Sequence, residues 1–306
     1  MTTAPAATPA QSVQSPLAGI LWMLATTLCF VAVNGIVHYL GTELPAVQGA
    51  FIRFAWGFVF LIPMLTRVLR QTRYSGREWG LFGLRGVFHT IGVGLWFFAM
   101  AHIPMAEVTA IGYLNPIVVT LGAALFFGER LTAGRALAGV VALIGALVIL
   151  RPGLREIAAG HWAQLAAALF FGLGYLTAKR LSQFAPASVV VAMMSVTVTL
   201  FLAPFALAVW TPVSLVQVLW LGGVALFATA GHYCMTRAFT AAPLAVTQPV
   251  VFLQLLWAAI LGMAVFGEPV DPWVIAGGAL IIAAISGLAW REQISRRRAR
   301  TTAPTA

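Results

Sequence analysis

Ten long apolar segments constrain the fold of this chain more than any other feature. An α-helix needs about 20 apolar residues to cross the hydrocarbon core of a membrane. The connections between the segments are short, so no soluble domain is inserted between them. We therefore predict an all-α integral membrane protein with ten transmembrane helices, at Leu17–Leu40, Ala46–Leu65, Trp79–Ala101, Met105–Phe127, Ala133–Leu150, His161–Leu181, Ser188–Trp210, Leu215–Thr240, Leu244–Phe266 and Pro272–Trp290.

The composition agrees with a membrane protein and argues against a nucleic-acid-binding one. Of the 306 residues, 61% are hydrophobic and 8% are charged, whereas a soluble domain has about 25% charged residues. The net charge of +10 comes largely from Lys and Arg in short connections and in the C-terminal segment. We expect the lipid bilayer as a partner, and no nucleic acid. Cys29 and Cys234 lie in apolar runs, which predicts packing roles; we expect no disulfide, metal or cofactor.

The basic residues also predict the orientation, because cytoplasmic connections of membrane proteins are rich in Lys and Arg. If the N-terminus is cytoplasmic, nearly all Lys and Arg residues outside the helices fall on the cytoplasmic side. Only Arg151 and Arg155 fall on the other side. This bias predicts that both termini lie in the cytoplasm. Residues 1–16 are predicted to be a disordered tail, and residues 291–306 a basic cytoplasmic tail.

One block occurs twice in the sequence, which indicates an internal duplication. A shift of 139 residues places Trp96–Gly139 on Met235–Gly278, and in the first two helices of each copy the shift is 141. The predicted units are repeat 1, residues 17–150, and repeat 2, residues 161–290, with five helices each. Because five is odd, the second repeat must lie inverted in the membrane, as in many secondary transporters. The matched positions include Pro104 with Pro243, Gly128 with Gly267 and Glu129 with Glu268.

Polar side chains recur at helical spacing in several predicted helices, and we expect them to face inward because lipid disfavours polar groups. In the third helix, His89 and Trp96 share a face on which Gly92 leaves a gap for a ligand ring. Any single residue of this kind can instead serve an interhelical hydrogen bond. The set predicts a cavity for a planar or amphipathic metabolite. Its candidate residues are Asn34, His38, His89, Gly92, Trp96, Tyr113, Asn115, Tyr175, His232, Tyr233, Gln248, Gln254 and Trp257.

Two charged residues lie within helices near their predicted outer ends. Arg53 is in the second helix and Glu107 is in the first turns of the fourth. A charge at the centre of a membrane helix costs about 2.5–3.5 kcal/mol, and pairing with an opposite charge reduces that cost. We therefore predict a charge pair between Arg53 and Glu107. The alternative is that Arg53 extends to the lipid headgroups while Glu107 is hydrated.

Prolines within helices and small residues on helix faces suggest where the bundle bends and where it packs closely. Each proline removes one backbone hydrogen bond, so it marks a candidate hinge or a site of static curvature. The small residues of the fifth and tenth helices, such as Gly145 and Gly277, predict close packing, with a homodimer face as the alternative. The hinge candidates are Pro63, Pro116, Pro204 and Pro249.

The sequence lacks the common catalytic motifs. It has no phosphate-loop motif, no HExxH pair, no GxSxG elbow and no carboxylate pair inside a predicted helix. We therefore predict that the chain is not an enzyme, with a membrane-embedded enzyme as a less favoured alternative. A channel or facilitator is a second alternative, which the inverted repeats and the kinked helices disfavour.

The chain resembles the drug/metabolite transporter superfamily, EamA type, from Leu17 to Trp290. The resemblance rests on Arg53-Phe54, Trp96-Phe97-Phe98-Ala99, Pro104, Ala106, Asn115-Pro116, Gly128-Glu129 and Gly267-Glu268. In the second copy, Leu255 stands where the family has a proline. The resemblance implies ten helices and a central cavity lined by helices 1–4 and 6–9. It also implies secondary transport of a small metabolite by alternating access, with amino-acid export as one common assignment. We therefore expect a multi-pass protein of the bacterial inner membrane.

Overall fold

The computed structural model describes residues 16–71, 74–128, 131–154, 156–242, 247 and 250–301. These residues form helices joined by short connections, and no strand occurs among them. The all-α fold that the apolar segments predict is therefore confirmed. The helices are α1 (Pro16–Leu40), α2 (Ala46–Gln71), α3 (Gly76–His102), α4 (Met105–Gly112), α5 (Asn115–Phe127), α6 (Ala133–Leu150), α7 (Ala159–Leu181), α8 (Ala187–Ala208), α9 (Leu215–Ala241), α11 (Leu253–Phe266) and α12 (Pro272–Thr301).

The helices are long and apolar enough for a membrane protein. Among the described residues, seven spans have the length and composition to cross a membrane, with α4 and α5 counted as one. Two shorter apolar helices, Ala46–Ile62 within α2 and the whole of α11, add to them. Most helix bounds agree with the predicted segments to within a few residues. The largest difference is in α12, which continues as helix through the basic segment to Thr301.

Helix ends recur in the 139-residue register, which supports the duplication. α3 and α9 both begin with a capping box, formed by Ser75 in the first case and Ser214 in the second. In a capping box, the side chain of the N-cap residue accepts the N–H of the residue three positions later. The side chain of that residue in turn accepts the N–H of the N-cap residue. α5 and α11 both end at a glycine with positive φ, Gly128 at 65° and Gly267 at 66°. Glycine adopts this conformation without steric cost, which explains why both Gly-Glu pairs contain it.

The helix predicted over Met105–Phe127 is broken, and this corrects the sequence interpretation. α4 ends at Gly112, Tyr113 and Leu114 form a turn, and α5 begins at Asn115. Pro116 therefore sits in the first turn of a new helix rather than at a kink within one. Proline suits that position because the first N–H groups of a helix have no partner within it.

The break has a counterpart in the second repeat. α11 begins at Leu253, which the 139-residue shift places on Leu114. No proline stands at this start, since Leu255 occupies the position that corresponds to Pro116. Of the other hinge candidates, Pro204 lies inside the continuous helix α8, Pro63 lies within α2, and Pro249 is outside the described residues.

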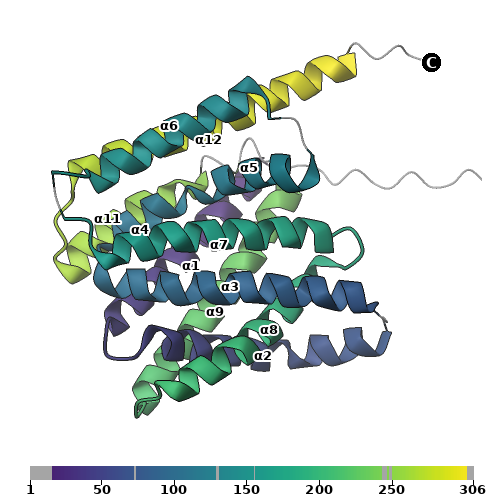
Figure 1. Cartoon of the computed structure of the whole chain (residues 1–306), viewed down its shortest axis with the longest axis vertical. Helices are drawn as coiled ribbons and strands as arrows, with labels where there is room; N and C mark the ends of the chain where they lie inside the picture. Colours follow the sequence, from purple (N-terminus) through teal and green to yellow (C-terminus); the bar gives the residue numbers. More distant parts are fainter. Residues whose placement is uncertain are drawn as a thin grey trace, which may run out of the picture.

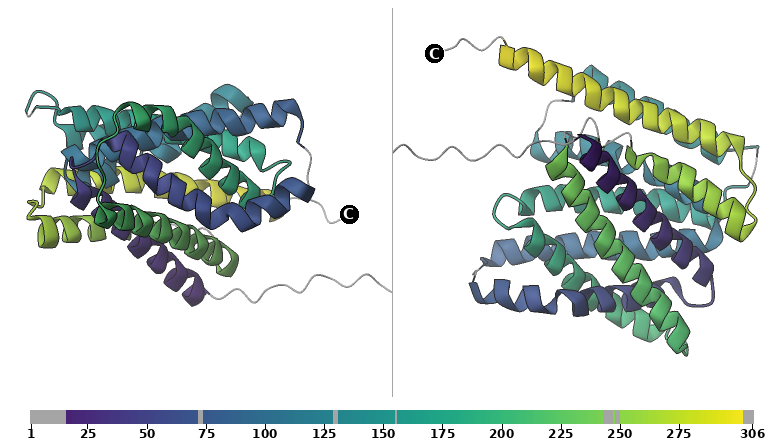
Figure 2. Two further views of the ribbon diagram at one scale, coloured as in Figure 1. Left: turned by 90° about the horizontal axis from the view of Figure 1, so that it is seen from below. Right: turned by 180° about the vertical axis from the view of Figure 1, so that it is seen from behind.

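The helices pack in pairs that join one repeat to the other. α3 packs along α7, α1 along α9 and α2 along α8, while α6 and α12 lie side by side along one edge of the bundle (Figures 1 and 2). A Cβ atom on Gly145 would lie 2.6 Å from the carbonyl oxygen of Gly277, so these glycines allow α6 and α12 to touch. The packing role predicted for the small residues is therefore confirmed, and both glycines serve a contact within one chain.

The inverted arrangement of the repeats can be tested by labelling two exposed positions. Leu131 and Val270 are related by the 139-residue shift, and each is 48% exposed. Single cysteines at these positions, in a background without Cys29 and Cys234, should react with an impermeant thiol reagent from opposite sides of the membrane. Leu131→Cys should react from the cytoplasmic side and Val270→Cys from the periplasmic side. Reaction of both from the same side would rule out inverted repeats.

Candidate functional site

Hydrogen bonds between the two repeats gather at one end of the bundle, which we call the outer end after its predicted orientation. The Gln48 amide donates to the carbonyl oxygen of Thr211 at 2.9 Å and accepts from its N–H at 3.0 Å. The Gln217 amide donates to the Glu43 carboxylate at 3.0 Å. These contacts join the α1–α2 region to the α8–α9 region. The connections at this end are 41–45, 103–104, 151–158, 209–214 and 267–271.

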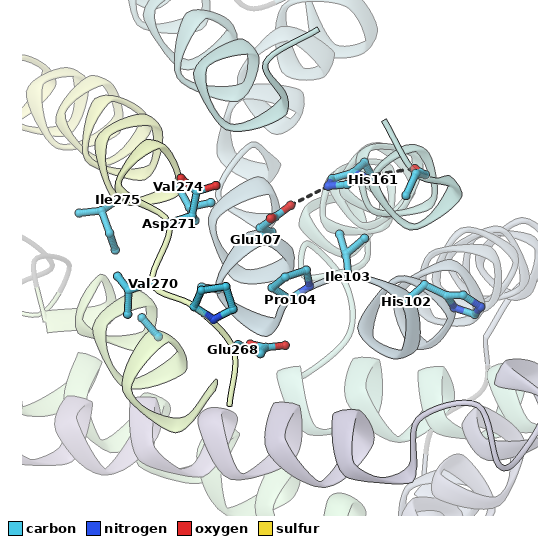
Figure 3. Close-up of a pocket in the computed structure, with 14 residues that line it drawn as sticks. His102, Ile103, Pro104, Glu107, His161, Glu268, Val270, Asp271, Val274 and Ile275 are labelled. Carbon is cyan, nitrogen blue, oxygen red and sulfur yellow. Dashed lines mark hydrogen bonds and ion pairs between the residues drawn. The ribbon is translucent and has the colours of Figure 1, made fainter. Parts of the chain in front are cut away.

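A pocket of about 360 Å³ lies at the outer end, between the α3–α4 connection, the start of α7 and the α11–α12 connection. Figure 3 shows three acids at this pocket: Glu107, Glu268 and Asp271. Each has a basic partner, and for Asp271 this is the guanidinium of Arg151. Each acid at the pocket is therefore paired with a basic side chain. In the described part of the chain, no group of three or more His, Cys, Asp or Glu is arranged to hold a metal ion.

Glu107 and His161 form a buried pair across the repeats. The Glu107 carboxylate lies 2.6 Å from His161 Nε2, and their side chains are 4% and 5% exposed. Glu107 is in the first turn of α4, where the helix dipole favours a negative charge. The predicted pair of Glu107 with Arg53 is not formed, because α2 packs against α3, α8 and α9. The Arg53 guanidinium lies instead 3.9 Å from the centroid of the Phe54 ring.

Glu268 joins three elements at the outer end. One carboxylate oxygen lies 3.0 Å from Nε2 of His38 in α1, and the other accepts the N–H of Met105, at the start of α4, at 3.1 Å. The second ring nitrogen of His38, Nδ1, lies 2.5 Å from the carbonyl oxygen of Met100 in α3. The glutamate of the second Gly-Glu pair thus caps a helix of the first repeat.

A second group of polar and aromatic side chains lies between the helices, away from the outer end. The His89 ring in α3 lies 5.1 Å from the Phe171 ring in α7 and 5.7 Å from the Phe54 ring in α2, measured between centroids. Arg85, one turn before His89, is 8% exposed and donates to the carbonyl oxygen of Val190 at 2.6 Å. Residues of both repeats therefore meet around His89.

α1 and α9 add to the same group. The rings of Phe30 and His232 lie 5.2 Å apart. His89 interacts electrostatically with His232 and with both arginines, and Tyr175 interacts with Arg85. Tyr175 retains 54% of its surface exposed and His232 is also exposed, so protein does not seal the group on all sides. We call it the central cluster; its members are Phe30, Arg53, Phe54, Arg85, His89, Phe171, Tyr175 and His232.

Comparison with known proteins gives the family. The model of the EamA-like transporter family matches residues 17–151 and 158–290, which is most of the chain. The chain belongs to the EamA-like transporter family. It is therefore a multi-pass membrane transporter of the bacterial inner membrane and not an enzyme, as the sequence predicts. The two matched ranges also correspond to the two predicted repeats.

Named relatives of this EamA-like transporter carry small metabolites. It is 27% identical to a riboflavin transporter of Vibrio cholerae, covering 92% of this chain and 96% of that protein. It is 30% identical to a riboflavin transporter of Brucella anthropi, with 86% and 95% covered. It is 26% identical to the pseudopaline exporter of Pseudomonas aeruginosa, with 88% and 95% covered. The chain is accordingly a transporter of a small metabolite.

A solved crystal structure has the same fold as this EamA-like transporter. The two share 19% sequence identity, with a TM-score of 0.59 over 90% of this chain and 98% of that one. At this identity the likeness bears on the fold alone. It shows that the helix arrangement occurs in a protein of diverged sequence.

The ligand gap predicted at Gly92 is filled in the structure, and this corrects the sequence interpretation. A Cβ atom on Gly92 would lie 2.9 Å from the Phe171 ring, so Gly92 provides room for Phe171 rather than for a ligand. Trp96, the ring expected to face the gap, packs edge-on against Phe97 with centroids 5.2 Å apart. Of the residues predicted on this face of α3, His89 belongs to the central cluster, together with Arg85 one turn before it.

The other predicted site residues are spread over the bundle. Asn34 donates to the Thr109 hydroxyl at 3.3 Å and is 6% exposed, as expected for an interhelical hydrogen bond. His38 is at the outer end, and Tyr233 packs against Trp22. The Tyr113 ring lies 5.3 Å from the Phe252 ring. The carbonyl of Asn115 and the indole N–H of Trp257 are buried without a hydrogen-bond partner among the described residues. Gln254 follows the start of α11, whereas Gln248 and Glu129 are outside the described residues.

Two features of the site were missed from the sequence. The phenylalanines of the central cluster were not among the candidates, although the 141-residue shift relates Phe30 to Phe171 and marks both. His161 was treated as the start of a helix, although a polar residue in an otherwise apolar first turn suggests a partner. The partner is Glu107, 54 residues away in sequence.

A size-swap experiment tests the contact between Gly92 and Phe171. Gly92→Leu should displace Phe171 and disturb the central cluster, which lowers the stability of the protein by about 1–3 kcal/mol through overpacking. Adding Phe171→Ala should restore much of the loss, as measured by thermal unfolding in detergent. Gly83→Leu, at a position of α3 with open space around it, is the control and should change little. No rescue by Phe171→Ala would contradict the contact.

A double-mutant cycle tests the pairing of Glu107. Glu107→Gln and His161→Gln should each destabilise the protein, and their effects should be non-additive by about 1–3 kcal/mol because the two side chains share one buried contact. Glu107→Gln combined with Arg53→Gln provides the control, and these effects should add. Strict additivity for Glu107 and His161, measured by unfolding in detergent, would show that the pair does not form.

Proposed function

We propose that this EamA-like transporter carries riboflavin or a related planar heteroaromatic metabolite, and that the central cluster binds it. The observation on which the proposal rests is the composition of that cluster. Two arginines and two histidines lie among three phenylalanine rings, supplied by α1, α2, α3, α7 and α9. Aromatic rings favour a planar partner through stacking and edge contacts, each worth about 0.5–1.5 kcal/mol beyond area burial.

The arginines favour a substrate whose edge is rich in hydrogen-bond acceptors. A guanidinium has five N–H donors and no acceptor, so it recognises carbonyl, carboxylate or phosphate oxygens. The flavin ring presents two carbonyl oxygens and ring nitrogens along one edge. A ring of this kind can stack on a phenylalanine while its edge accepts from Arg53 or Arg85. The names of the relatives at 27% and 30% identity support the same substrate class.

The position of the acids argues against a substrate with an ammonium group, such as an amino acid or an organic cation. An ammonium group needs a carboxylate or several carbonyl oxygens to replace its water. The eight acidic residues of the chain are Glu43, Glu78, Glu107, Glu129, Glu156, Glu268, Asp271 and Glu292, and all lie at or beyond the ends of the predicted spans. The centre of the bundle therefore offers positive groups without acids, which disfavours the amino-acid assignment.

Transport proceeds by alternating access in this proposal. The hydrogen bonds at the outer end join the repeats on that side, which supports a state closed toward the periplasm. The exposed surfaces of Tyr175 and His232 support access to the cluster from elsewhere. Separation of the repeats at the outer end would then open the cluster to the other side, with the broken helix at Tyr113 as a point of bending.

Binding of riboflavin to purified variants tests the proposal. Wild-type protein should quench flavin fluorescence, and Arg53→Gln or Arg85→Gln should weaken binding about 10-fold to 100-fold, the effect of removing a charged hydrogen-bond donor worth about 1.5–3 kcal/mol. Arg77→Gln, at an exposed position near the start of α3, is the matched control and should bind like wild type. Equal binding by all three variants would remove the arginines from the site, and no binding by wild type would overturn the substrate class.

A further inference from the structure

The geometry points to a proton-binding site at His38 and Glu268 that controls opening of the outer end, so that this end closes with a proton bound and opens when the proton is lost. The inference concerns the pair of side chains that joins α1 of the first repeat to the α11–α12 connection of the second. It does not depend on the identity of the transported metabolite.

The first argument concerns the number of protons that the His38–Glu268 pair holds. Both ring nitrogens of His38 face acceptors: Nδ1 lies 2.5 Å from the Met100 carbonyl oxygen, and Nε2 lies 3.0 Å from the Glu268 carboxylate. A neutral imidazole has one N–H and can donate to only one of them. Both contacts are hydrogen bonds only if the pair holds one proton more than a neutral imidazole plus a carboxylate. That proton resides either on the ring or on the carboxyl group.

The second argument is that the pair bridges the repeats. Glu268 also accepts the N–H of Met105 at the start of α4, where the helix dipole favours its charge. The side chains of His38 and Glu268 are 16% and 14% exposed, so water screens their interaction only in part. Without the extra proton, the ring has a single N–H, and either the Glu268 carboxylate or the Met100 carbonyl oxygen then faces a ring nitrogen as a second acceptor. Loss of the proton therefore either removes the hydrogen bond between the repeats or removes the charge that strengthens it, so the attraction between the repeats is weaker at this point.

The third argument comes from the matching position of the other repeat. The 141-residue shift places His38 on Lys179, and the 139-residue shift places Phe266 on Phe127. The His38 ring lies 4.6 Å from the Phe266 ring, and the Lys179 ammonium lies 5.4 Å from the Phe127 ring. Matching positions thus meet in both repeats, with a histidine beside the phenylalanine in one and a lysine in the other. Lysine keeps its proton until about pH 10, whereas imidazole loses it near pH 6.5.

Because of this difference between histidine and lysine, we expect the periplasmic end of the transporter to respond to pH and the cytoplasmic end not to respond. The contact of Lys179 with Phe127 lies on the predicted cytoplasmic side, where pH varies little. His38 lies on the predicted periplasmic side, where the pH follows the surroundings of the cell. A histidine there responds to pH in the physiological range and a lysine does not.

The other titratable groups near the pair have partners of their own. Glu107 is paired with His161, Asp271 with Arg151, and Glu43 accepts from Gln217. His102, at the end of α3, contacts the carbonyl oxygen of Phe98 and stacks on its ring. The acids here other than Glu268 thus have no contact with His38 among the described interactions. His161 is the one other histidine here that is paired with an acid, and the test below separates it from His38.

The test measures opening of the outer end as a function of pH. Spin labels at Thr42 and Val270, both exposed and one in each repeat, report the distance across the outer end of the full-length protein in proteoliposomes. In wild type the closed-to-open ratio should fall as the pH rises from about 5 to about 9, by up to tenfold per pH unit while one proton is released. His38→Lys should remain closed over this range, because it gives the outer end the chemistry of Lys179.

Matched variants keep the test decisive. His38→Gln retains a donor for Glu268 without a titratable group, so it should also lose the pH dependence if His38→Lys does not fold. His102→Gln, which changes a neighbouring histidine that has no acid partner among the described contacts, should behave like wild type. A wild-type distance that does not change with pH would overturn the inference. So would an unchanged pH dependence in both His38 variants, or its loss in His161→Gln but not in His38→Gln.

Discussion

The two repeats are held together at their outer ends by hydrogen bonds between side chains and helix ends, and the arrangement of the other helices depends on these contacts. Gln48 binds the backbone of Thr211, and Glu268 caps α4 while it binds His38. In lipid, helices gain little from burying apolar surface against each other, so polar contacts and close backbone approach determine which helices pair. Close approach serves α6 and α12 at Gly145 and Gly277, and also α3 and α7 at Gly92. Polar contacts join the outer ends of α1 and α2 to those of α8 and α9.

Acidic and basic side chains occupy different parts of the bundle, and this separation connects the architecture with transport. At the outer pocket, each of the three acids is paired with a basic side chain. The central cluster instead has Arg53, Arg85 and two histidines, and in the sequence every acid lies at or beyond the end of a predicted span. A ligand that brings acceptor atoms or negative charge offsets the cost of holding the two arginines between the helices, whereas an empty centre leaves that cost unmet. The same division explains why a substrate with an ammonium group is disfavoured.

Much of the fold could be predicted from the sequence, because lipid allows few solutions. The lengths of the apolar segments predicted most helix bounds. The repeated Gly-Glu pairs marked two helix ends, where the positive φ of Gly128 and Gly267 is a conformation that glycine adopts without strain. The break at Tyr113 was missed because a proline fits both a kink within a continuous helix and the first turn of a new helix. Pro116 occupies the first turn of α5. The pairing of Glu107 was also missed: the sequence showed its depth in the membrane but not that α7, rather than α2, begins beside it. The gap at Gly92 looked open because its occupant, Phe171, comes from the other repeat.

The central claim is that the repeats separate at the outer end during transport, and cross-linking across that end tests it most directly. Glu43 is exposed, Gln217 is half-buried, and the two lie in contact, one in each repeat. Cysteines at both positions, in a background without Cys29 and Cys234, can be joined by a short bifunctional thiol reagent that a reductant cleaves. In proteoliposomes in which the unlinked protein exchanges labelled riboflavin, cross-linking should stop the exchange and reductant should restore it. Exchange at the full rate by the cross-linked protein would contradict the account.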